Sequence, residues 1–206
     1  MFIHEMFQQK PCVFSVEVFP PKKAGAAEET LYPVLRELCT LGPDYISVTY
    51  GAGGGTAGQS TAKIASYIKN GLHVEALAHL TCVNSTRVQV EETLTRLRED
   101  NVENVLALRG DINPDLPRRM DFLHASDLAK AIAQTGGFGV AGACYPEGHV
   151  ESPSLKADVE SLRYKAEAGV SHLITQLFFD NVSYYRFLNM ARKAGISLPV
   201  QAGIMP

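Results

Sequence analysis

The sequence predicts a single α/β domain over residues 1–206, a (β/α)8 barrel of the TIM type in which about seven strands and six helices are present. Short apolar runs rich in β-branched residues alternate with amphipathic segments of helical period along the whole chain. Polar side chains that can do chemistry recur at the ends of these runs, roughly thirty residues apart, which is the length of one strand, one helix and two short loops. Strands joined by such crossovers run parallel, so these groups should meet at one rim, where barrels of this type place their active sites.

The first half of the chain shows this cycle clearly. Residues 12–18 form a β-rich run that must end at Pro20 and Pro21, because a proline pair cannot continue a central strand. Residues 26–41 carry leucines at helical spacing, and Gly42 supplies a left-handed stop. Further strands are predicted at 45–50, 74–81 and 102–108, and further helices at 60–70 and 86–99.

The second half repeats the cycle. Ser126 is the predicted N-cap of a helix that ends at Gly136, a second helix starts near Leu155 and ends at Gly169, and Asp180 caps a third that runs to Gly195. Strands are predicted at 138–144, 172–177 and 198–202. One more helix, strand and helix would complete the eightfold barrel, so we expect a domain that is incomplete at its C-terminus, with open edge strands that favour a homo-oligomer.

The composition is that of an ordinary soluble globule, with 46% hydrophobic and 20% charged residues. A net charge of −3 and a pI near 6.1 argue against nucleic-acid and membrane partners. No leader peptide or apolar span is visible, so we expect a cytoplasmic protein. Four scattered cysteines form no C-x-x-C pair and are predicted to be small buried hydrophobes.

Glu17 is the candidate acid. Strand alternation puts Ser15 and Glu17 on one face and Val16 and Val18 on the other, and in a barrel the first face is the interior. Desolvation there should raise the pKa of Glu17 enough for it to hold a proton near neutral pH. The alternative is a structural carboxylate paired with a buried Lys or Arg.

A glycine-rich segment, residues 51–58, follows a predicted strand and formally satisfies G-x-G-x-x-G. A dinucleotide-binding fold requires this motif after its first strand and an acidic residue at the end of the next, whereas Glu75 lies at the start of the following strand. We therefore expect a flexible rim loop that covers a ligand, and regard a Rossmann fingerprint as the weaker reading.

Two other groups of polar residues carry alternatives. Arg109-Gly110-Asp111 ends an apolar strand and could hold a planar anionic ligand, or form a salt bridge within a turn. Asp158, Ser161 and Lys165 share one helix face and could reach a ribose and a phosphate, or be a solvated face. His79, Tyr145 and His149 lie near strand ends but lack metal-binding spacing, so no metal is expected.

These segments together resemble the methylenetetrahydrofolate reductase family, in its compact bacterial form, over essentially the whole chain. The stretches that carry the resemblance are FSVEVFPPK at 14–22, YISVTYGAGG at 45–54, AHLTC at 78–82, NVLALRGD at 104–111, ASDL at 125–128, AGACYPEGH at 141–149, ADVESLRYK at 157–165 and LITQLFFD at 173–180. The resemblance implies a barrel that binds FAD and uses NAD(P)H to reduce 5,10-methylenetetrahydrofolate to 5-methyltetrahydrofolate, a step of one-carbon metabolism that serves methionine biosynthesis. The implied kinetics are ping-pong, with hydride transfer through the flavin.

The resemblance also implies roles by position. Glu17 matches the general acid that protonates the folate ring nitrogen and so opens the methylene bridge. Asp111 matches an acid beside the pyrimidine side of the flavin that also contacts the pterin, and Gln176 matches a folate-contacting amide. Flavin-contacting positions are matched by Thr49, His79, Leu108, Arg109, Gly110, Asp111, Ala125, Tyr145, His149, Asp158 and Lys165.

Three positions depart from the family pattern. His124 stands where a Tyr is usual, and Ser161 and Tyr164 replace an Asn and an Arg, so the hold on the FAD ribose and phosphates is expected to differ. Two other functions stay open. One is a truncated, non-catalytic flavin-binding barrel. The other is a cofactor-free lyase or aldolase, which needs a Schiff-base lysine at a strand end, where only Lys22 and Lys23 follow a strand.

Overall fold

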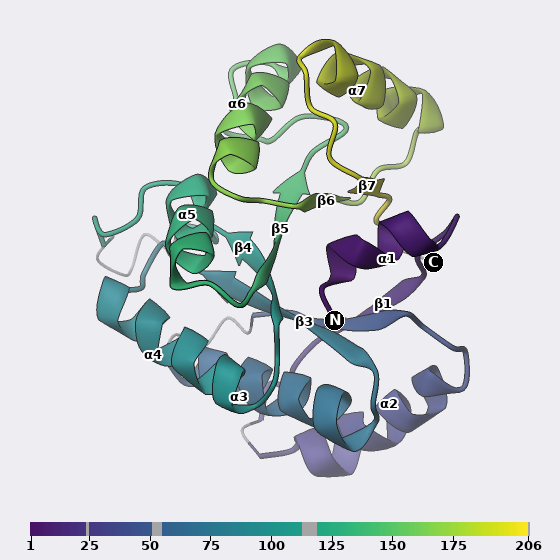
Figure 1. Ribbon diagram of the computed structural model, residues 1–206, viewed down its shortest axis with the longest axis vertical. Helices are drawn as coiled ribbons and strands as arrows, with labels where there is room; N and C mark the ends of the chain where they lie inside the picture. Colours follow the sequence, from purple (N-terminus) through teal and green to yellow (C-terminus); the bar gives the residue numbers. More distant parts are fainter. Residues whose placement is uncertain (24, 51–54, 113–118, 206) are drawn as a thin grey trace.

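A computed structural model describes residues 1–23, 25–50, 55–112 and 119–205 as one curled parallel sheet with helices on its outer face (Figure 1). The strand order is β1-β2-β3-β4-β5-β6-β7, the order in which the strands occur in the chain. This is barrel topology, and it excludes a Rossmann fold, in which the first strand lies inside the sheet. The seven predicted strands are confirmed as β1 (Ser15–Val18), β2 (Tyr45–Val48), β3 (Glu75–Thr81), β4 (Asn104–Leu108), β5 (Gly139–Cys144), β6 (His172–Thr175) and β7 (Val200–Gln201).

Six helices of the predicted cycle cover the outside of the sheet. The main core lies between these two layers and contains buried residues such as Leu35, Ile64, Leu94 and Phe187. The helices are α2 (Tyr32–Cys39), preceded by a π-helical turn η1 (Ala27–Leu31), α3 (Gly55–Ser66), followed by a second such turn η2 (Tyr67–Gly71), α4 (Arg87–Glu99), α5 (Ala125–Thr135), α6 (Leu155–Glu167) and α7 (Asn181–Lys193).

Of the predicted helix N-caps, the one for α7 is confirmed and the one for α5 was wrong. Asp180 caps α7 as predicted, because its carboxylate accepts from the backbone N–H groups of Val182 and Ser183. The predicted cap of α5 was wrong: His124 holds the N-cap position, and Asp127 reaches back to accept from its backbone N–H. The helix predicted at 60–70 also begins earlier, at Gly55.

An additional helix that the sequence pattern did not predict, α1 (Ile3–Gln9), lies inside the curve of the sheet (Figure 1). Ile3 and Met6 form a second core with Tyr45, Leu77 and Leu106 of the strands. Asn104 anchors the helix, since its Oδ1 accepts from the Ile3 N–H at 2.8 Å and its amide donates to the Met1 carbonyl at 3.1 Å. The amino-terminal end of the barrel interior is thus filled by apolar side chains.

The two edge strands of the described sheet are connected through the barrel interior by Gln201. Its amide nitrogen donates to Ser15 Oγ at 2.9 Å, and its amide oxygen accepts from the Tyr45 hydroxyl. Burial raises the pKa of that phenol to about 12. The Gln201 side chain therefore links β7 to β1 and β2, although β7 pairs in the described sheet only with β6.

The prediction for the cysteines was partly wrong. Cys82 and Cys144 are fully buried, and burial raises the pKa of each thiol to about 12, so they are inert apolar side chains. Cys12, in contrast, is exposed, because the strand it was assigned to begins only at Ser15. No helix in the described ranges has the length and apolar character needed to cross a membrane.

His172 makes the fold sensitive to acid. It is 1% exposed at the start of β6, against the ring of Phe7, and neither ring nitrogen has a hydrogen-bond partner in the described part of the chain. Burial and the neighbouring His4 lower the pKa of His172 to about 4. The unfolded chain therefore binds a proton at this site first, so stability is complete above the unfolded pKa of 6.5 and is lost as the pH falls toward 4.

We expect His172→Leu to reduce this acid sensitivity. Between about pH 7.5 and about pH 5, protonation of His172 in the unfolded chain should lower the free energy of unfolding of the wild type by about 2 kcal/mol. Urea denaturation at the two pH values measures this decrease, and the variant should lack this contribution. His73→Asn is the control, because His73 is exposed and its positive φ of 57° suits asparagine. Equal acid sensitivity in wild type and His172→Leu would contradict this assignment.

Candidate functional site

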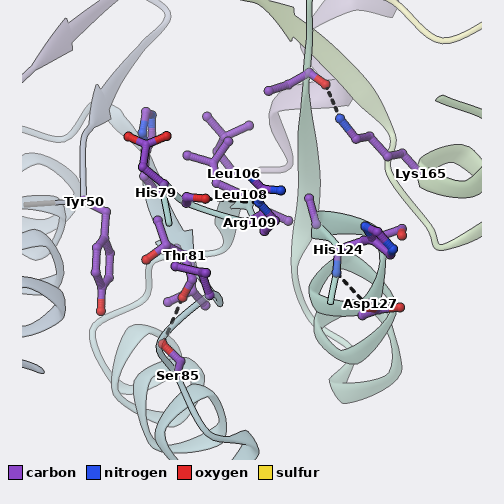
Figure 2. A pocket seen from close by; sticks show the side chains of 18 of the residues that line it. Tyr50, His79, Thr81, Ser85, Leu106, Leu108, Arg109, His124, Asp127 and Lys165 are labelled. Carbon is purple, nitrogen blue, oxygen red and sulfur yellow. Dashed lines mark hydrogen bonds between the residues drawn. The ribbon is translucent and has the colours of Figure 1, made fainter. Parts of the chain in front are cut away.

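One cavity of about 1710 Å³ opens at the carboxyl ends of the strands, and every site residue predicted from the sequence lines it. Its volume exceeds the roughly 300–1,000 Å³ of a pocket for a drug-sized ligand, so it has room for a ligand as large as a dinucleotide. Figure 2 shows His79, Leu108 and Arg109 on one side and His124 and Lys165 on the other. The predicted residues brought together are Glu17, Thr49, His79, Leu108, Arg109, Gly110, Asp111, His124, Ala125, Tyr145, His149, Asp158, Ser161, Lys165 and Gln176.

Glu17 faces the cavity from β1, as strand alternation predicted. Val18 is buried on the opposite face against the helices, and Ser15 points inward to Gln201. The Glu17 carboxylate lies 3.4 Å from Ser47 Oγ and 3.5 Å from His79 Nε2, so the alternative of a paired Lys or Arg is not what the described residues show. Desolvation by the barrel walls raises the pKa of Glu17, while the Ser47 hydroxyl acts in the opposite direction.

His79 is held in its neutral form. Its ring lies on β3, is 8% exposed, and approaches Ser47 Oγ to 2.7 Å. Burial lowers the pKa of His79 to about 4, so it carries no charge near neutral pH. The ring can therefore either donate or accept at Nε2.

Arg109, just beyond the end of β4, is fixed by an ion pair that the sequence did not predict. Its two terminal nitrogens donate to the two carboxylate oxygens of Glu151 at 2.7 and 2.6 Å. This bidentate pair raises the pKa of Arg109. The alternative reading, a salt bridge with Asp111 within the turn, was wrong, because the Asp111 side chain is exposed at the cavity and Arg109 is turned toward the loop after β5.

Gly110 is explained by its backbone conformation. Its φ is +86°, and a Cβ at this position would lie 3.1 Å from the Thr81 side chain and 3.2 Å from that of Val83. A glycine is therefore required for packing against the end of β3, independently of any ligand.

Helix α6 presents a polar face to the cavity instead of to solvent. Lys165 is half-buried and donates to the Ala143 carbonyl at 2.6 Å, and desolvation lowers the pKa of its ammonium group. Asp158 accepts from the His149 backbone N–H at 3.1 Å, and Ser161 also lines the cavity. Asp158, Ser161 and Lys165 are all partly exposed and line the cavity together, as the predicted binding face requires.

The remaining predicted residues are held mainly by backbone contacts. The Thr49 carbonyl accepts from the Thr61 hydroxyl at 2.9 Å, which ties the end of β2 to α3. Gln176 follows β6, and its side-chain oxygen accepts from the Leu177 N–H. A flexible loop was predicted at 51–58. Its residues 51–54 lie outside the described part of the chain, and its residues from Gly55 on belong to α3.

Two residues that contact predicted site residues, Ser47 and Glu151, escaped the sequence analysis. Ser47 has the same inward parity on β2 as Thr49, so strand alternation could have identified it. Glu151 follows β5 in a loop, where no periodic signal exists. In the described parts of the chain, no group of three or more His, Cys, Asp or Glu side chains has an arrangement that could hold a metal ion.

Comparison with known proteins finds one family over nearly the whole chain. The model of the methylenetetrahydrofolate reductase family matches residues 2–206. The 5,10-methylenetetrahydrofolate reductase of Pectobacterium carotovorum is 38% identical over 93% of this chain and 63% of its own length, and that of Escherichia coli is 36% identical over 93% and 64%. A plant relative, methylenetetrahydrofolate reductase (NADH) 1 of Arabidopsis thaliana, is 36% identical over 99% of this chain and 37% of its own length. The chain thus spans less than two thirds of these relatives.

Solved structures with low sequence identity support the barrel fold. An uncharacterized protein from Clostridium thermocellum that binds two copies of 5-methyl-5,6,7,8-tetrahydrofolic acid has a TM-score of 0.61 at 15% identity and covers 96% of this chain and 67% of its own. Oxaloacetate acetylhydrolase has a TM-score of 0.63 at 10% identity and covers 97% and 78%. At these identities the likeness concerns the fold alone.

Proposed function

Because this chain belongs to the methylenetetrahydrofolate reductase family, we propose that its cavity supports the reduction of 5,10-methylenetetrahydrofolate to 5-methyltetrahydrofolate with NAD(P)H, through bound FAD. The observation that carries the proposal is the position of Glu17: this acid, whose pKa is raised, lines the same cavity as the half-buried cation of Lys165. A proton donor and an anion-stabilising cation around one large cavity are what this reduction needs from a protein.

The residues present fit a flavin. Within the described residues, the half-buried ammonium group of Lys165 donates to the Ala143 carbonyl, and an ammonium group with three hydrogens retains donors for another acceptor. Arg109, Tyr145 and His149 offer further polar contacts around the same cavity. When bound, the flavin would supply hydride transfer between the nicotinamide and the folate.

Glu17 is proposed as the acid of the folate step. Burial raises the pKa of this carboxyl group and so favours its acid form, and the proton would go to the folate ring nitrogen whose protonation opens the methylene bridge. Asp111 would contact the pterin and the flavin ring, and Gln176 would bind folate through its amide. Since one cavity would serve both substrates, we propose that they occupy it in turn, in a ping-pong order.

The test is a spectrum followed by two additions. Purified protein should show flavin absorbance, NAD(P)H should bleach it in the absence of oxygen, and methylenetetrahydrofolate should then restore it. Flavin that is bound but not bleached would favour the non-catalytic flavin-binding barrel, and protein that takes up no flavin would reject the proposal.

A matched pair of lysine variants shows whether the flavin uses this cavity. Lys165→Met should weaken flavin binding about 10- to 100-fold, because it removes a buried charged donor. Lys156→Met, on the same helix but 79% exposed, should leave flavin binding unchanged. Equal affinities in the two variants, measured by fluorescence titration, would place the flavin elsewhere.

A further inference from the structure

Three polar side chains from successive strands meet beneath the cavity. Glu17 on β1 is the register partner of Ser47 on β2, and His79 comes from β3. Ser47 Oγ lies 2.7 Å from His79 Nε2 and 3.4 Å from the Glu17 carboxylate. Ser47 and His79 are 3% and 8% exposed, whereas the Glu17 side chain is 46% exposed. The serine hydroxyl therefore joins an accessible acid to a buried imidazole.

The single hydrogen of the hydroxyl allows two arrangements. If Ser47 donates to an ionised Glu17, its own oxygen accepts from an Nε2–H of His79. If Glu17 is protonated and donates to Ser47, the hydroxyl hydrogen points to a bare Nε2 and His79 carries its hydrogen on Nδ1. Both arrangements need a neutral ring, which deep burial of His79 provides.

We propose that Ser47 is a positioning residue that holds the Glu17 carboxyl group in place and, together with the neutral ring of His79, reverses the direction of its hydrogen bond when Glu17 releases its proton. The inference deepens the proposed function and rests on it for its catalytic meaning. Its structural content, a coupling between the Glu17 proton and the His79 tautomer, stands on the two contacts of Ser47 with Glu17 and His79.

Among the residues that the structure describes, no other cluster around Glu17 offers the same coupling. The titratable groups that face Glu17 from the neighbouring strands are His79 on β3 and the Tyr45 phenol on β2. The Tyr45 hydroxyl is engaged with Gln201. A donor at Ser47 would favour the carboxylate that remains after proton release, and this opposes the desolvation that favours the acid beforehand.

The direct test uses nuclear magnetic resonance of the whole chain without turnover. With ¹³C-labelled glutamate and ¹⁵N-labelled histidine, the Glu17 carboxyl signal is identified by its absence in Glu17→Gln. As Glu17 is titrated from ionised to protonated, His79 Nε2 should change from a protonated to an unprotonated nitrogen signal. An Nε2 signal that stays the same through the titration overturns the proposal.

Variants separate this coupling from general packing. Ser47→Ala should raise the pKa of Glu17 by about half a unit to one unit and uncouple the two signals, because the bond that favours the carboxylate is gone. Ser47→Thr, which keeps a hydroxyl, should restore the coupling. Ser171→Ala is the matched control, since this serine donates to the Val140 carbonyl at the opposite end of the sheet, and it should leave the titration of Glu17 unaltered.

The outcomes also distinguish this inference from the proposed function. Coupled signals in a protein that does not reduce folate would retain the Ser47 assignment and reject the reductase. Folate reduction by the wild type with an unchanged Glu17 titration in Ser47→Ala would retain the reductase and reject the role of Ser47.

Discussion

Glu17→Gln should slow the folate half-reaction about 10²- to 10⁴-fold, the range lost when a general acid is removed, while reduction of bound flavin by NAD(P)H continues. The amide fills the same space as the carboxyl group but has no acidic proton to give. Anaerobic stopped-flow absorbance at the flavin band measures the two half-reactions separately. In the wild type, the folate step should also slow as the pH rises through the raised pKa of Glu17, because the acid form is then lost.

Glu160→Gln is the matched control for this experiment. Glu160 lies on α6 at the surface, where it pairs with Lys156 at 3.9 Å, and both half-reactions should be unchanged. If Glu17→Gln slowed the two half-reactions equally, Glu17 would be needed for the shape of the cavity and not for proton donation.

Leu77→Ala should lower the free energy of unfolding by about 2–5 kcal/mol, the range for emptying a buried leucine site. Leu77 is fully buried in the second core, where it packs with Ile3 and Met6 of α1 and with Tyr45 and Leu106 of the strands. Rigid strand backbones on several sides prevent the space from collapsing. Chemical denaturation, fitted as a two-state transition, measures the change.

Leu41→Ala provides the comparison for the same chemical change at the surface. Leu41 is 62% exposed, so its loss should alter stability by no more than about 0.5 kcal/mol. If Leu77→Ala lowered the free energy of unfolding by less than about 1 kcal/mol, α1 and the strands would not form a tightly packed second core.

The periodic pattern of the sequence predicted the strands, the helices and the faces on which their side chains lie. Strand alternation correctly predicted that Glu17 faces the interior and Val18 faces the helices. The predicted parallel strand order also correctly implied that Arg109 and Lys165 would line one cavity. Ser47 could have been found by the same parity rule. The catalytic and binding roles themselves remain proposals, since convergence shows where side chains meet and not what they do.

The features that were missed depend on contacts between distant segments. Helix α1 has only seven residues and begins after Phe2, which is not a usual N-cap residue, and it is stabilised by Asn104 far along the chain. The partner of Arg109 was missed because Glu151 lies in an irregular loop, where backbone geometry alone decides which carboxylate comes near. Burial of Lys165 likewise depends on how α6 docks against β5.

The Arg109–Glu151 ion pair affects how the cavity would bind a negatively charged ligand. The guanidinium already has both oxygens of a carboxylate, so an incoming phosphate or carboxylate would exchange partners with Glu151 instead of meeting a bare cation. Two bonds would break as two form, and the net gain in affinity would be small. Arg109 would then contribute mainly to specificity, because it would favour ligands that present two oxygens in the same arrangement as the Glu151 carboxylate.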